Sequence, residues 1–234
     1  MRKEDIYDML QEIDEALLVV AENYVKATED KGVKEIVKVK IKNTMENLRS
    51  CLDYCLHDID EQILNNHREV IYFPYKRSKR DFKNAINSNF KGLRNRSPKI
   101  YSALESVQDF NNREKPWLTI LCKKTNKVKH DKSLKQTRED NFEINVGNGA
   151  ITMKNCTNFN LKGSINGVPF PTLTDADGGN GISEEWINSP ISIERIDWVY
   201  FKIIGTNLDV LEFLTLCKNE IQRMVEDIYL EMER

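Results

Sequence analysis

The sequence has no long apolar run and no secretory leader. Its 234 residues are 40% hydrophobic, but no stretch approaches the roughly 18 to 20 uninterrupted apolar residues that a membrane span requires. Charged residues directly follow Met1, so the apolar region of a signal peptide is missing, and we expect the mature chain to start there. The apolar fraction is too high for a disordered chain. These features predict a soluble, globular, cytoplasmic protein with no membrane contact.

Cysteine and histidine are also scarce. The five cysteines are scattered and form no Cys-x-x-Cys pair, which disfavours a disulfide framework or a zinc site and indicates buried thiols in a reducing compartment. Of the three histidines, His57 and His67 are expected late on one helix, with no third metal ligand beside them. No Walker A motif, dinucleotide fingerprint or nucleophile elbow occurs, so the sequence predicts neither a metal nor a cofactor.

Apolar residues recur every three or four positions over several stretches, which is the spacing of one buried helix face. This pattern predicts two long helices, at about 5–28 and 33–67, that pack as an antiparallel pair. A third long helix is expected near the C-terminus, from a cap at Thr206 or Asn207 to about residue 232.

Three shorter helices are predicted from their start signals. Ser78, with Asp81 three residues later, resembles a capped helix start, and Ser97 followed by Pro98 combines a cap with a favoured first helical residue. Pro116 starts the third. Between the long and the short helices, the Pro-containing segment 72–75 is expected to form a turn or an extended corner.

Near Asn141 the helical period gives way to Gly, Asn, Thr and short β-prone runs at 142–146, 150–153, 159–165 and 198–204. The sequence therefore predicts an α+β fold. We divide it into a helical domain at 1–140, a β-rich segment at 141–205 and a C-terminal helix at 206–234 that packs back on the bundle.

The net charge of −2 conceals a strong separation of charge along the chain. Residues 68–138 contain 19 Lys and Arg against 6 Asp and Glu, whereas the rest contains 16 against 31. Clustered cations bind phosphate backbones, and exposed aromatic residues stack on bases, so this window suggests a surface for single-stranded or folded nucleic acid. Arg77 and Arg80, beside Tyr72 or Tyr75, are the first candidates. In the alternative interpretation, the window packs against the acidic segments and leaves no patch.

The segment KKTNKVKHD, residues 123–131, has the clearest chemical potential. On a helix Asn126 and His130 are four residues apart and share a face. A histidine among lysines could act as general acid or base on an RNA 2′-hydroxyl while the lysines hold the phosphate. The candidate catalytic residues are His130, Asn126 and Lys124. The candidate nucleic-acid ligands are Lys123, Lys127, Lys129, Lys132, Arg77 and Arg80. A solvated basic face is the plainer alternative.

The first 135 residues resemble the HEPN superfamily of helical proteins, which are common in bacterial toxin and antiphage systems. The resemblance rests on LRSCLDYCLHDI at 48–59, then YFPY, then IYSALESVQDF at 100–110 before the basic segment. It implies a helical bundle, often a homodimer, with a ribonuclease motif of Arg, a polar residue, a spacer and His. Asn126 and His130 match the latter part, but Thr125 stands at the Arg position. Lys124 or Lys123 could substitute for the Arg electrostatically, although a Lys lacks the planar fork that holds a phosphate in two places.

Three functions remain open. The leading hypothesis is a HEPN-like protein of a defence or toxin-type system that interacts with RNA and is catalytically impaired. The first alternative is a metal-independent endoribonuclease that uses His130. The second is a non-enzymatic module that binds a protein partner through the β-rich segment. RNA, a protein partner and a second copy of the chain are therefore the expected partners.

Overall fold

The chain has the predicted α+β fold and divides into two compact units. The computed structural model describes residues 1–114, 116–130, 135–174 and 184–234, except for the side chains of 127–130, 184 and 185. The first unit consists of Met1–Asn23, Glu35–Gln136 and Phe201–Arg234, and the second of Tyr24–Lys34 and Thr137–Tyr200. Each unit is thus assembled from stretches that are far apart in sequence.

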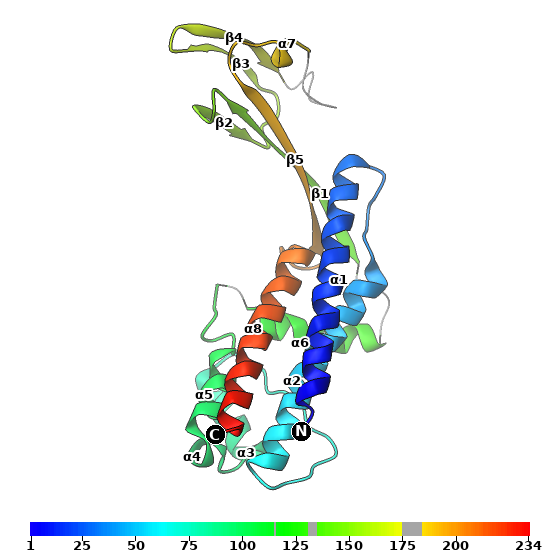
Figure 1. The fold of residues 1–234 in the computed structure, drawn as a ribbon, viewed down its shortest axis with the longest axis vertical. Helices are drawn as coiled ribbons and strands as arrows, with labels where there is room; N and C mark the ends of the chain where they lie inside the picture. The colour runs from blue at the N-terminus through cyan, green and yellow to red at the C-terminus, as the bar shows by residue number, and fades with distance from the viewer. Residues whose placement is uncertain (115, 131–134, 175–183) are drawn as a thin grey trace. The chain divides into compact units, whose positions relative to one another are not determined.

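The first unit is a helical bundle (Figure 1). Its helices are α1 (Lys3–Glu29, whose end belongs to the second unit), α2 (Lys38–Gln62), α3 (Lys79–Asn89), α4 (Leu93–Arg96), α5 (Pro98–Ser106), α6 (Trp117–His130) and α8 (Val210–Met232). The C-terminal helix α8 packs against α2, α5 and α6, as the sequence predicts. No helix within the described ranges combines the length and the hydrophobicity that crossing a bilayer requires.

Helices α1 and α2 form the expected antiparallel pair, but α2 is shorter than predicted at both ends. At its start, the Ile36 amide donates to Gln136 Oε1 at 3.0 Å, and Gln136 Nε2 donates to the Ile36 carbonyl at 2.9 Å. These bonds remove Ile36 from any helical ladder, so the helix begins at Lys38. At the other end α2 stops at Gln62, which leaves His67 beyond the helix.

Local caps explain which of the shorter helices were predictable. The Ser78 and Ser97 hydroxyls accept from the amides of Asp81 and Ile100, as their sequence signals indicate. The predicted cap of α8 at Thr206 or Asn207 is wrong. Asp209 caps this helix by accepting from Leu211 and Glu212, because a carboxylate stabilises the positive end of the helix dipole.

A buried carboxylate joins three helices at one end of the bundle. Asp58 on α2 has no exposed surface. It accepts from the Arg2 amide at 2.6 Å, from Arg2 Nη1 at 2.9 Å and from the Tyr229 hydroxyl at 2.7 Å. Burial and this hydrogen bond raise the pKa of Tyr229 well above its ordinary value, so the phenol remains a donor. The ends of α1 and α8 are thereby fixed to α2.

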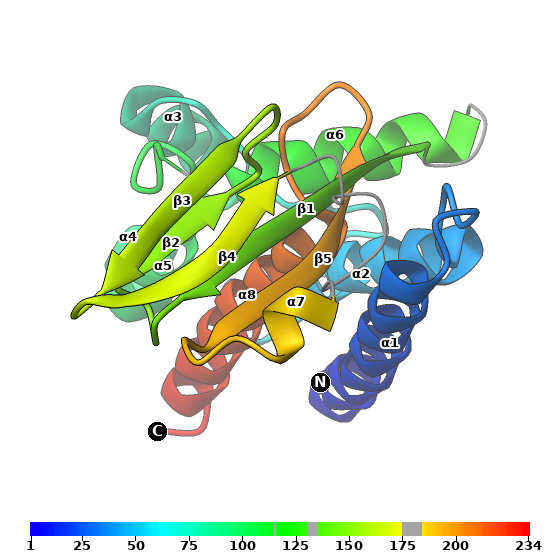
Figure 2. The ribbon, with the colours of Figure 1, turned by 90° about the horizontal axis from the view of Figure 1, so that it is seen from above.

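The second unit is built from two small sheets that share one core. Its strands are β1 (Gln136–Val146), β2 (Ile151–Lys154), β3 (Asn160–Ile165), β4 (Val168–Thr174) and β5 (Ile193–Ile203), with the short helix α7 (Glu184–Ile187). One sheet has the order β2-β1-β5 and the other is the β3–β4 hairpin (Figure 2). Ile144, Phe170 and Trp186 are among the buried residues of the common core.

Strand β4 was not predicted, because its sequence VPFPTLT contains two prolines. The strand pairs only with β3 in a two-stranded sheet, so Pro169 and Pro171 do not interrupt a central ladder. The β1–β2 turn meets the hairpin closely. Gly147 has a φ of +64°, which residues with side chains rarely adopt, and an added Cβ would lie 2.2 Å from Ile165 Cδ1, so a larger residue would strain the backbone and displace the end of the Ile165 side chain.

Arg138 anchors the end of α1 within the second unit. Only 5% of its side chain is exposed, and it forms an ion pair with Asp140 at 2.6 Å. Its guanidinium donates to the carbonyls of Ala27, Asp30 and Val33, each at 2.7 Å. These carbonyls lie at the C-terminal end of α1 and in the turn after it, where the helix leaves its acceptors unpaired.

We predict that Tyr229→Phe destabilises the bundle by about 1.5 to 3 kcal/mol, because the buried Asp58 carboxylate loses one donor. Tyr54, also in the first unit, is partly exposed. Tyr54→Phe is therefore the matched control and should change the free energy of unfolding by about 0.5 kcal/mol or less. Urea unfolding followed by circular dichroism measures both. Equal effects of the two variants would contradict the role of Tyr229 as a donor to Asp58.

The thiols give a second prediction. Cys51, Cys55, Cys122 and Cys217 are buried, as expected, whereas Cys156 is partly exposed. Burial raises the pKa of Cys51 and of Cys122 to about 12. Dithionitrobenzoate should therefore react rapidly with one thiol of the native chain and with all five only after unfolding. Rapid labelling that persists in Cys156→Ser would show that the core opens.

Candidate nucleic-acid interface

The sequence segments that carry the family resemblance meet inside the bundle through Arg49 and Asp53 of α2. Arg49 Nε lies 3.2 Å from Asp53 Oδ2, and Asp53 Oδ1 accepts from the Phe73 amide at 2.8 Å. The Arg49 guanidinium also donates to the Cys122 thiol on α6 and lies 5.7 Å from the centre of the Tyr75 ring. Since only 9% of the Arg49 side chain is exposed, this arginine is a structural residue and does not offer its charge to a ligand.

Gln108 and Asp109, at the end of the 100–110 segment, bind the backbone of the 72–76 segment and of α6. Gln108 Oε1 accepts from the Lys76 amide at 3.0 Å, and its Nε2 donates to the Pro74 carbonyl at 2.9 Å. The Asp109 carboxylate accepts from the amides of Leu118 and Thr119, at 3.1 and 3.0 Å. Asp109 therefore satisfies amides of the first turn of α6 from outside the helix and fixes where α6 begins.

On α6, Thr125, which the resemblance places at the Arg position of the motif, faces the core. Thr125 is 2% exposed, and its hydroxyl donates to the carbonyls of Leu121 and Cys122, at 2.9 and 3.1 Å. Lys124, the candidate substitute, donates to the Ile204 carbonyl at 2.7 Å. Lys123 and Asn126 are exposed. The side chains of His130, Lys127 and Lys129, and all of Lys132, lie outside the described residues.

The other two predicted ligands belong to a group of basic residues on and around α3. Arg77 and Arg80 are exposed, as are Lys91 and, in part, Lys83. Within the described residues, no hydrogen bond or ion pair engages these four side chains. Tyr72 precedes them in the extended segment before α3 and is 72% exposed. We call these residues the α3 surface: Tyr72, Arg77, Arg80, Lys83 and Lys91.

Many other cations of the basic window are neutralised within the first unit. Arg68 pairs with Asp60 at 2.5 Å, Lys79 with Glu105 at 3.0 Å and Lys99 with Glu231 at 3.0 Å. Arg96 donates to the carbonyls of Ile63 and Leu64 after the end of α2. For these residues the alternative interpretation holds, in which groups elsewhere in the chain engage the basic window. The four cations of the α3 surface, by contrast, have no ion pair among the described residues.

The aromatic residues of the basic window also divide into buried and exposed ones. Those that occupy the core are Phe73, Phe82, Phe90, Tyr101 and Trp117. Tyr101 also lies under Arg94, whose guanidinium is 5.6 Å from the ring centre. Tyr72 is therefore the aromatic residue of this window with the most surface available for stacking on a base.

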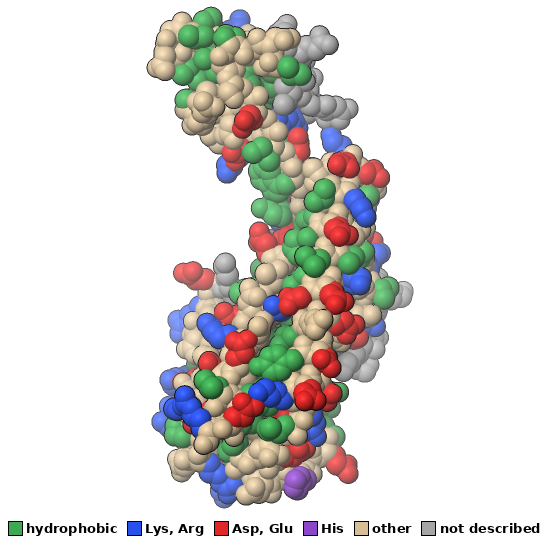
Figure 3. All heavy atoms as spheres, viewed as in Figure 1, with side chains coloured by type: hydrophobic (Ala, Val, Ile, Leu, Met, Phe, Trp, Pro, Cys, Tyr) green, Lys and Arg blue, Asp and Glu red, His purple; other side chains and the backbone are tan. Residues whose placement is uncertain are grey.

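The basic end of α6 does not join the α3 surface. In the two views of Figures 1 and 2, α6 runs away from α3 and α4, so its C-terminal end lies on the opposite side of the bundle. On the face drawn in Figure 3, Lys and Arg side chains gather over α4 and α5, and Asp and Glu side chains follow α1. The basic residues of α6 and those of the α3 surface therefore lie in separate regions of the first unit.

The potential metal ligands in the described part of the chain do not cluster. Among those residues, no group of three His, Cys, Asp or Glu side chains could hold a metal ion. His57 is half-buried on α2, and His67 is exposed after it.

We predict that Asp53→Ala destabilises the bundle by about 3 kcal/mol, because Arg49 loses its carboxylate in a nearly dry site. The partly exposed pair of Lys42 and Glu46 has the same spacing on the same helix. Glu46→Ala is therefore the matched control and should cost about 0.5 kcal/mol or less. Thermal unfolding of both variants measures the difference, and a larger loss in the control would overturn the structural role of Arg49.

Comparisons of the chain with protein-family models, with curated proteins and with solved structures find no match. The residues that sequence reasoning missed are three acids, the partly buried Asp53 and the buried Asp58 and Asp109. Each lies within a predicted helix or at its end, and its sequence neighbourhood gives no sign of donors that are distant along the chain.

Proposed function

We propose that this protein binds single-stranded or folded RNA through the α3 surface and does not cleave it. The observation that carries the proposal is the group of four basic side chains, without partners among the described residues, that follows the exposed Tyr72. Lysine and arginine side chains that bind phosphates release counterions, which provides affinity without reading the sequence. An exposed tyrosine adds stacking on unpaired bases, which favours a single strand or a loop over a regular duplex.

The absence of cleavage in this proposal rests on the motif helix. A HEPN-like ribonuclease needs a cation beside its histidine, but Thr125 is directed into the core and Lys124 is bound to a backbone carbonyl. A lysine held in this way is poorly placed to stabilise a developing phosphorane charge. We extend the proposal to a catalytically impaired, HEPN-like bundle that belongs to a bacterial defence or toxin-type system.

The double variant Arg77→Ala/Arg80→Ala tests the α3 surface. We expect its affinity for a fluorescein-labelled, single-stranded RNA to fall by about an order of magnitude at low salt, measured by fluorescence anisotropy. The slope of log affinity against log salt should become shallower by about 0.7 for each phosphate that the variant no longer neutralises. Lys79→Ala/Lys99→Ala is the matched control, because it removes the same charge from residues that already form ion pairs.

Three results would overturn this assignment. The first is no RNA binding by the wild-type chain at low salt, and the second is an equal loss of affinity in the control. The third is RNA cleavage in the presence of EDTA that His130→Ala abolishes, which would establish the metal-independent ribonuclease instead. A separate double variant, Lys127→Ala/Lys129→Ala, reports whether the end of α6 also binds the RNA.

A further inference from the structure

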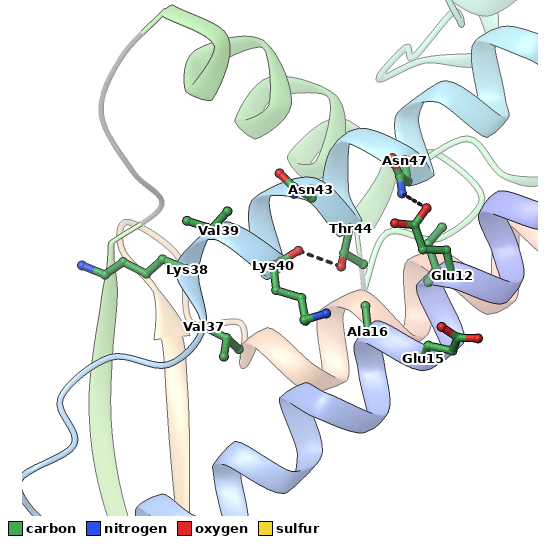
Figure 4. A pocket seen from close by; sticks show the side chains of 11 residues that line it. Glu12, Glu15, Ala16, Val37, Lys38, Val39, Lys40, Asn43, Thr44 and Asn47 are labelled. Carbon is green, nitrogen blue, oxygen red and sulfur yellow. Dashed lines mark hydrogen bonds between the residues drawn. The ribbon is translucent and has the colours of Figure 1, made fainter.

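A surface cavity of about 600 Å³ lies between α1 and the first turns of α2, within the first unit (Figure 4). This volume falls in the range of small-molecule sites, about 300 to 1,000 Å³. The cavity shares no residue with the α3 surface or with the motif of α6. Its lining residues are Glu12, Ile13, Glu15, Ala16, Val37, Lys38, Val39, Lys40, Asn43, Thr44 and Asn47.

The two walls of this α1–α2 cavity carry opposite charges. Glu12 and Glu15 come from α1, and Lys40 reaches from α2 towards α1 with its ammonium group near Ala16 (Figure 4). Asn47 Nδ2 donates to the Glu12 carboxylate at 3.1 Å. In the described part of the chain, neither Glu15 nor Lys40 has an ion-pair partner for its charged group. A cation and an anion thus face the same cavity without neutralising each other.

The remaining lysine of the wall is engaged elsewhere. Lys38 forms an ion pair with Glu35, and in Figure 4 its side chain points away from Glu12 and Glu15. Lys40 is therefore the ammonium group that is available to a ligand in this cavity.

Between the charged walls the cavity has a partly apolar floor. Ile13 and Ala16 of α1 are buried, with 0% and 7% exposure, and Val37 lies opposite them at the start of α2 (Figure 4). The Thr44 hydroxyl donates to the Lys40 carbonyl at 2.9 Å, so its proton is not available to a ligand. A bound molecule would therefore place apolar atoms against Ile13, Ala16 and Val37.

We propose that the α1–α2 cavity binds a small zwitterion with an apolar side chain, of the class of free amino acids and dipeptides. The carboxylate of the ligand pairs with Lys40, its ammonium group pairs with Glu15 and Glu12, and its side chain covers the apolar floor. A ligand with only a positive charge would leave Lys40 unpaired, and one with only a negative charge would meet two carboxylates. The zwitterion alone satisfies both walls.

Titration of the full-length, ¹⁵N-labelled chain with the dipeptide Leu-Leu, with free leucine and with N-acetyl-leucine amide tests this site. We expect saturable amide shifts at the cavity residues with at least one zwitterion, and an affinity at least about tenfold lower for the uncharged amide. Comparison of Leu-Leu with leucine identifies the size of the ligand. Absence of saturable binding by both zwitterions, or equal binding of the uncharged amide, would overturn the proposal.

Matched substitutions locate the charges that act on the ligand. Lys40→Gln and Glu15→Gln should each weaken binding of the zwitterion roughly two- to fivefold, because each removes one partly solvated ion pair. Lys42→Gln and Glu22→Gln change the same charges outside the cavity and should leave the affinity unchanged. An equal loss in these controls would show that net charge, and not the α1–α2 cavity, governs binding. Neither outcome bears on RNA binding, which involves other residues.

Discussion

The helical bundle depends on the buried carboxylate of Asp58, which requires hydrogen-bond donors from other parts of the chain. Asp58 has no exposed surface, and a charge removed from water is tolerated only where it is paired and hydrogen-bonded. Its donors come from Arg2 and from Tyr229, which lies 171 residues away. The first turn of α1 and the last turns of α8 are therefore fixed on α2. Helix α8 thus completes the core of the bundle although the β-rich segment precedes it in the sequence. Removal of this anion would leave two chain ends without a common attachment.

Pairing between distant residues also determines which basic side chains of residues 68–138 remain without an ion pair. Counting charges by segment suggests a broad basic surface, because residues 68–138 hold 19 cations against 6 anions. Folding pairs Arg68 with an acid 8 residues away and Lys99 with one 132 residues away. A sum over sequence cannot foresee such pairs, since it contains no information on which segments meet. The four cations of the α3 surface, which have no ion pair among the described residues, therefore form a smaller and more localised group than the count implies.

Features set by neighbouring residues were predictable, and features set by distant ones were not. The caps at Ser78 and Ser97 involve donors three residues away, so the sequence placed α3 and α5 correctly. The start of α2 depends on Gln136, 100 residues later, and was placed too early. Among the site residues, the exposure of Arg77 and Arg80 follows from their polarity. The burial of Thr125 does not, because a threonine suits either face of an amphipathic helix.

The face of α6 also constrains its chemistry. Thr125 shares its side of the helix with Leu118, Leu121 and Cys122, all of which are buried. An arginine at position 125 would enter this apolar layer and require a buried counter-charge. Asp53 and Asp109, two acids that lie close enough to act on Cys122, already accept from Arg49 and from the first amides of α6. Neither acid is thus free to pair with such an arginine. The packing that makes this helix a stable part of the bundle therefore also separates it from phosphate chemistry at that position.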